Sequence, residues 1–139
     1  IKFAYSGSAD PNRYGLSCEV LPSHMSFEGP EAELGAGTYV VSLNQLYGLY
    51  TRQVRDEFWS DPRNQKAYRE LTSRFAGAVV ASRESEKMDD ARAKDRYRLA
   101  RQWRLINRLK HRAPDERAGS SMFVFHLTED DVRTMLAPD

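Results

Sequence analysis

The chain has 139 residues, of which 40% are hydrophobic and 29% charged, and its formal net charge at pH 7 is +1. This length and apolar content suit one domain with a buried core and exclude an intrinsically disordered chain. The single cysteine excludes an intrachain disulfide and a cysteine-based zinc cluster, and no apolar run approaches the roughly 20 residues of a membrane-spanning helix. We therefore expect a cytoplasmic protein in a reducing compartment with no membrane attachment. Because the first residue is Ile1 and not methionine, we also allow for a fragment of a longer chain.

Two short strands are predicted near the start of the chain. Residues 1–5 alternate apolar and polar side chains, and residues 16–21 form the second candidate, with a loop between them. Residues 22–37 contain two prolines, three glycines and three glutamates, which predicts an acidic loop.

Three central helices are predicted next. Apolar residues follow helical spacing from Leu43 to Phe58, and Ser42 is a candidate N-cap. Pro62 suits the first position of a second helix. Its apolar stripe is Tyr68, Leu71, Phe75, Ala78 and Val79. Asp89 and Asp90 offer an N-cap for a third helix over about residues 91–112, so we favour a break there.

The end of the chain predicts a loop, a strand and a helix. Residues 113–121 contain a proline and a glycine, residues 122–127 (MFVFHL) have strand character, and Thr128 with the acids after it suits the start of a short helix. The order of strands, three helices, strand and helix predicts a helix-rich α+β domain spanning residues 1–139.

Residues 91–117 differ strongly in net charge from the rest of the chain. They hold ten basic residues against three acidic ones, a local charge of +7 within a chain of net charge +1. Residues 1–61 and 118–139 are acidic, with net charges of −4 and −3, and residues 62–90 carry +1. A segment as basic as residues 91–117 requires an anionic partner, which the sequence leaves open as nucleic acid, another protein or the acidic parts of this chain.

One face of the predicted third helix gathers most of these charges. At 100° per residue, six cations fall within an arc of about 120°, and we call them the cationic stripe. The cationic stripe consists of Lys94, Arg98, Arg101, Arg104, Arg108 and Arg112. Tyr97 and Leu105 lie in or beside the arc, where they could touch bases, and Leu99, Trp103 and Ile106 lie on nearly the opposite side. Arginine suits bidentate phosphate contacts, so the stripe with Tyr97 is our candidate nucleic-acid site.

Three functions are compatible with this pattern of charge. The first is a non-catalytic module that binds the phosphates of RNA or DNA as a subunit of a nucleoprotein assembly. The second is a structural or assembly protein, such as a virion or complex component, whose basic helix docks on an acidic protein surface. A protein partner or a homo-oligomer is compatible with this function. The third is a nuclease or toxin domain that uses His24 with Glu19 or Glu28. We assign no catalytic residue, metal ligand or cofactor.

Two further groups of residues bear on partners and structure. Aromatic residues are concentrated between Tyr47 and Trp59; most are expected in the core, whereas Leu49 and Trp59 are candidate anchors for a partner. His126 alternates with apolar residues in the predicted strand, which indicates a half-buried structural histidine.

Overall fold

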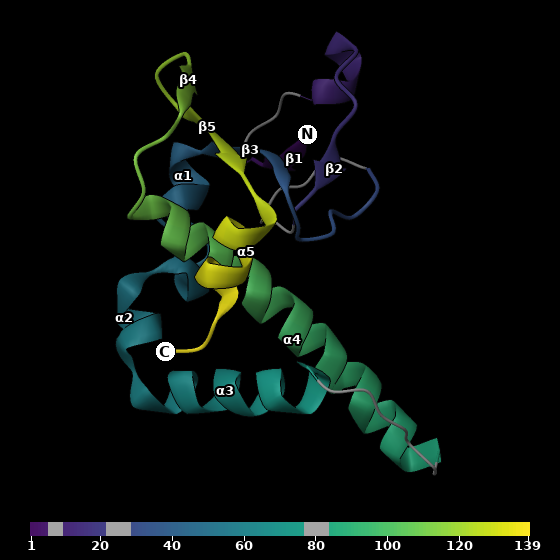
Figure 1. Cartoon of the computed structure of the whole chain (residues 1–139). Helices are drawn as coiled ribbons and strands as arrows, with labels where there is room; N and C mark the ends of the chain where they lie inside the picture. Colours follow the sequence, from purple (N-terminus) through teal and green to yellow (C-terminus); the bar gives the residue numbers. More distant parts are fainter. Residues whose placement is uncertain (6–9, 22–28, 77–83) are drawn as a thin grey trace.

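The computed structural model describes residues 1–5, 10–21, 29–76 and 84–139. Within these residues the chain forms five α-helices and one five-stranded mixed sheet, which confirms the α+β class. The sheet lies at one end of the molecule, α3 (Pro62–Ala76) lies at the other, and α4 (Glu84–Lys110) runs between them (Figure 1).

The sheet combines parallel and antiparallel pairs. Its strands are β1 (Lys2–Ala4), β2 (Glu19–Val20), β3 (Gly37–Ser42), β4 (Glu116–Ala118) and β5 (Met122–Leu127), in the spatial order β2-β1-β3-β5-β4. β1 is parallel to β2 and β3, whereas β5 is antiparallel to β3 and β4. Neither β3 nor β4 is among the predicted strands. β3 directly follows the glycine-rich acidic loop, and β4 is a fully exposed polar strand without alternation.

One face of the sheet packs against the second half of α4. Tyr39 and Val41 of β3 and Phe125 of β5 are completely buried on this face. They join Leu105 and Leu109 of α4 in one apolar cluster. The short helix α5 (Glu129–Leu136) adds buried apolar residues to the same cluster. The core is therefore built around α4, which packs against the sheet and contacts α1 (Leu43–Leu46), α3 and α5.

The predicted helix over residues 43–58 is wrong as a single element. Ser42 caps α1 (Leu43–Leu46) as expected, but Gly48 then adopts φ 63° and the chain turns away. A short 3₁₀ turn and α2 (Asp56–Ser60) follow. Val54 is completely buried, and its carbonyl accepts a hydrogen bond from the Asn107 side chain at 2.9 Å. Tertiary contacts with α4 thus override the helical spacing of this segment.

The observed boundaries of α3 and α4 agree only in part with those predicted from the sequence. α3 begins at Pro62 as predicted, and Asp61 accepts the backbone N–H of Arg63 at 2.9 Å. The expected break at Asp89 and Asp90 is wrong, because α4 is continuous from Glu84. Asp90 forms an ion pair with Arg74 of α3 instead of capping a helix. Ala78 and Val79, which belong to the predicted apolar stripe of the second helix, lie outside the described residues.

The last helix begins where the sequence predicts, directly after Thr128. The Thr128 hydroxyl accepts the backbone N–H of Asp131 at 3.1 Å, and the Asp131 carboxylate accepts the backbone N–H of Thr128 at 2.8 Å. This capping box fixes the start of α5 directly after β5. α5 is thereby held across α4, where its apolar side reaches the core.

Gly48 and Gly119 adopt similar left-handed conformations, with φ 63° and 67°, and form a matched pair for mutagenesis. A Cβ at Gly119 would meet no atom within 4 Å, whereas a Cβ at Gly48 would lie 2.8 Å from the Thr51 carbonyl oxygen. Gly119→Ala should cost about 1 kcal/mol for its positive φ alone, and Gly48→Ala about 2 to 4 kcal/mol because the backbone must also shift. Denaturant unfolding of both variants measures this difference. Equal losses would show that the turn after α1 relaxes freely.

Candidate anion-binding surface on helix α4

The cationic stripe passes from an exposed to a buried environment along α4. Lys94 is exposed, whereas Arg104 is only 1% exposed and the neighbouring Leu105 is completely buried. From Gln102 to Leu109 the helix is covered on nearly all sides. Leu105 therefore belongs to the core and not beside an exposed cationic arc as expected. Ile106 and Trp103 do pack in or against the core, in agreement with the expected apolar face.

Arg104 is an internal structural residue. Its Nε donates a hydrogen bond to the Ala137 carbonyl at 3.1 Å, and its Nη2 lies 3.1 Å from the Asp139 carboxylate. The guanidinium carbon lies 5.2 Å from the Trp59 ring centroid and 4.9 Å from that of Tyr68. Two aromatic faces and two acceptors thus take the place of water around this buried charge. Arg104 does not face solvent and offers no surface to a phosphate.

The other two C-terminal members of the stripe also meet acids of this chain. Arg108 pairs with the same Asp139 carboxylate. Arg112 lies 3.1 Å from Asp131 and 3.8 Å from Asp115. In this half of α4, the acidic C-terminal segment of the chain is the partner of the basic helix.

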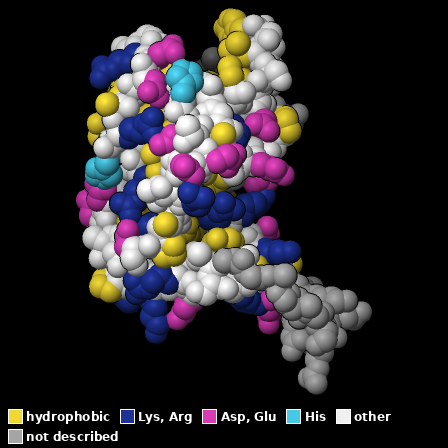
Figure 2. Space-filling view, viewed as in Figure 1, with side chains coloured by type: hydrophobic (Ala, Val, Ile, Leu, Met, Phe, Trp, Pro, Cys, Tyr) yellow, Lys and Arg dark blue, Asp and Glu magenta, His cyan; other side chains and the backbone are white. Residues whose placement is uncertain are grey.

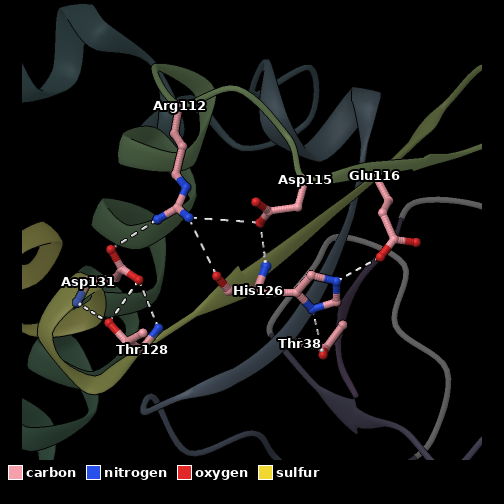
Figure 3. Close-up of polar contacts among 7 residues, drawn as sticks. All are labelled: Thr38, Arg112, Asp115, Glu116, His126, Thr128 and Asp131. Atoms are coloured by element: carbon pink, nitrogen blue, oxygen red, sulfur yellow. Dashed lines mark hydrogen bonds and ion pairs between the residues drawn. The ribbon is translucent and has the colours of Figure 1, made fainter.

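Arg112 also joins α4 to the sheet (Figure 3). Its Nη2 is 3.5 Å from the His126 carbonyl oxygen, and Asp115 accepts the His126 backbone N–H at 2.7 Å. Asp131, the other partner of Arg112, belongs to the capping box of α5. A single arginine therefore fixes the end of α4, the loop before β4 and the start of α5 relative to one another.

His126 lies between a hydroxyl and a carboxylate in the same view. Its Nδ1 is 3.1 Å from Thr38 Oγ1 and its Nε2 is 2.9 Å from Glu116 Oε1 (Figure 3). The side chain is about half exposed, which agrees with the half-buried structural histidine expected from the sequence. All three residues stand on one open sheet face across β3, β5 and β4. Stabilising cross-strand pairing accounts for this arrangement.

The N-terminal half of the stripe is more open. Arg98 pairs with Glu31 and lies 3.5 Å from Asp95. Lys94 and Arg101 form no ion pair with any described residue, and the Arg101 guanidinium carbon instead lies 5.6 Å from the Tyr97 ring centroid. Figure 2 shows basic side chains in a band across the middle of the molecule, with acidic side chains beside them. Within α4, Lys94 and Arg98 are exposed and Arg101 is partly exposed.

Arg101 and Leu34 line both of two neighbouring cavities beside α4. The first, of about 490 Å³, is lined by Arg98, Gln102 and the segment of residues 31–34. The second, of about 310 Å³, lies between α3, α4 and α5 and contains Tyr97. Tyr97 is half-buried, with Phe75 of α3 stacked on its ring at a centroid distance of 5.6 Å. The sequence could not reveal these cavities, because residues 31–34 complete the first and α3 and α5 complete the second, all far from Arg101 in the chain.

A further charged group at the end of α4 holds α2 in place. Burial alone raises the pKa of Asp56, but hydrogen bonds from Lys110, His111 and Asn107 outweigh it and lower the pKa to about 2. Lys110 lies 2.8 Å from one Asp56 oxygen and His111 lies 2.8 Å from the other. His111 and Lys110 therefore serve a structural contact with the acidic N-terminal part of the chain.

No family model, curated protein or solved structure matches this chain. The described residues contain no group of three or more His, Cys, Asp and Glu side chains that could hold a metal ion. His24 and Glu28, named for the nuclease alternative, lie outside the described residues. None of the described helices is long and apolar enough to cross a membrane.

Arg104 contacts Asp139 from the protein interior and Arg108 contacts it at the surface, so substituting each arginine compares the two environments. Arg104→Met removes charged hydrogen bonds and the contacts with two rings, so it should lower the free energy of unfolding by about 2 to 4 kcal/mol. Arg108→Met removes a surface ion pair and should cost less than about 1 kcal/mol. Urea denaturation checks both values. A small loss for Arg104→Met would mean that its burial is not needed for the fold.

Proposed function

We propose that this protein is a non-catalytic nucleic-acid-binding module that contacts phosphates through residues 92–101 in the middle of α4. Lys94, Arg98 and Arg101 of the cationic stripe, with the neighbouring Arg92 and Arg96, form this contact surface. The proposal retains the first function considered from the sequence but places it on a shorter surface. Arg104, Arg108 and Arg112 are excluded from it, because they are engaged with acids and carbonyl groups of this chain and their side chains are 2%, 37% and 31% exposed. Arg98 is retained, because it pairs with Glu31 but its side chain is still 48% exposed.

The observation that carries the proposal is uncompensated positive charge. Arg92, Lys94, Arg96 and Arg101 have no ion pair among the described residues, and the first three are exposed where α4 extends away from the sheet (Figure 1). Asp95 is the sole acid between residues 91 and 114. Like charges at these spacings destabilise a helix, and a phosphate backbone relieves that repulsion.

The second function, assembly with another protein, is favoured by a different surface. Leu43, Tyr47, Leu49 and Tyr50, all in or just after α1, are 38%, 60%, 55% and 53% exposed. Exposed apolar residues gathered in this way are typical of protein interfaces. Leu49 was expected there, whereas the other expected anchor, Trp59, is buried in contact with Tyr68.

A salt titration with matched variants tests the phosphate contact. For about five phosphate contacts, the logarithm of affinity for RNA or DNA should fall with the logarithm of salt concentration with a slope of about −3 to −5. Neutralising Arg92, Lys94 and Arg96 to Gln should reduce the magnitude of that slope by about 2 to 3. The control replaces the exposed Arg13, Arg52 and Lys66 with Gln and removes the same charge elsewhere. Equal losses for both variants, or no binding by the wild type at low salt, would refute the proposal.

Sedimentation tests the assembly function separately. If residues of α1 form an interface, the wild-type protein should associate with increasing concentration, and Tyr47→Ser with Leu49→Ser should shift it to the monomer without changing nucleic-acid affinity. A monomeric wild type at all concentrations would argue against self-assembly through this surface.

A further inference from the structure

The cavity between α3, α4 and α5 combines an aromatic wall, an apolar floor and a cation at its edge. Val132 and Leu136 of α5 and Leu34 supply apolar surface, Tyr97 supplies a ring, and Arg101 supplies the cation. Its volume of about 310 Å³ lies at the lower end of the range for small-ligand sites, which is suitable for one planar ring system.

The walls of this cavity are held by the surrounding structure. Tyr97 is stacked on Phe75 and lies 6.2 Å from the Tyr68 ring, so its orientation does not depend on a ligand. Val132 and Leu136 are buried members of the main core. Thr72 of α3 completes the wall, with its hydroxyl bonded to the Tyr68 carbonyl at 2.8 Å. The cavity is therefore rigid enough to select a shape.

Charge at the edge of the cavity favours an anionic ligand. Arg101 and Arg133 line it together with one acid, Glu129. Arg133 pairs with Asp130 outside the cavity, and Arg101 has no acidic partner among the described residues. Arg101 also borders the larger cavity next to Arg98, in line with Lys94. A cationic path thus leads along α4 to the edge of an apolar, aromatic cavity.

We infer that this cavity receives one base of a single-stranded nucleic acid, with the adjoining phosphate on Arg101 and the chain continuing toward Arg98 and Lys94. The inference rests on the proposed function and specifies its ligand as a single strand whose base is unstacked. Lys94 and Arg101 are seven residues apart, about 10 Å along the helix, which is about the length of two nucleotides of an extended strand. Aromatic and arginine surfaces are the groups on which single-stranded bases stack.

The decisive experiment compares two oligomers with equal numbers of phosphates. Short oligouridylate should bind the wild-type protein about tenfold more tightly than an abasic oligomer of the same length, because one base gains a stacking contact. Thr72→Phe places a ring in the cavity wall and should abolish that difference while leaving affinity for the abasic oligomer unchanged. Ser73→Phe is the matched control, because Ser73 is the next residue of α3 and is exposed.

A second variant keeps the test valid if Thr72→Phe does not fold. Tyr97→Leu removes the ring and retains apolar volume, so it should also lose the preference for oligouridylate. Equal affinity of the wild type for both oligomers would overturn the base site while the phosphate contact stands. Absence of binding to either oligomer would overturn both the base site and the proposed function.

Discussion

The fold depends on the burial of α4 on nearly all sides between Gln102 and Leu109. A helix in that position cannot direct its polar residues to solvent, so each of them needs a partner from another element. Asn107 binds the Val54 carbonyl and Asp56, and Arg104 binds the Ala137 carbonyl and Asp139. The Gln102 amide nitrogen reaches Glu31, whereas its buried oxygen has no partner in the described structure. These side chains attach the loops and the C-terminal segment to the central helix.

This arrangement explains most of the charge separation in the sequence. The acidic segments before and after the basic one return to α4 and pair with it, through Glu31 and Asp56 from one side and Asp131 and Asp139 from the other. Where the partners are exposed, each pair contributes little to stability, but together they neutralise the second half of the helix. The basic residues that form no ion pair with a described residue precede this neutralised part of the helix and are Arg92, Lys94, Arg96 and Arg101. The proposed nucleic-acid contact is confined to that region for this reason.

The sequence predicts those elements whose signals are local. Thr128 with its acids marks the start of α5, Pro62 marks the start of α3, and residues 122–127 form a strand as expected. The helix over residues 43–58 is wrong because Gly48 and the contact of Val54 with Asn107 act together, and only the second is invisible in the sequence. Five of the six residues of the cationic stripe lie on a helix as predicted, and Arg112 follows the end of α4. Helical spacing alone, however, cannot show that Trp59, Tyr68 and Ala137 enclose Arg104, because these residues lie far from it in the chain.

The contact of Arg104 with Ala137 and Asp139 also bears on how the molecule acquires its structure during synthesis. α4 ends at Lys110, so this arginine emerges from the ribosome well before the residues that satisfy it. Until they are available, closing the core over this arginine would leave its charge without acceptors. β5 likewise pairs with β3 across a long separation in the sequence. The packed state of the central helix and the sheet therefore depends on residues made long after Arg104.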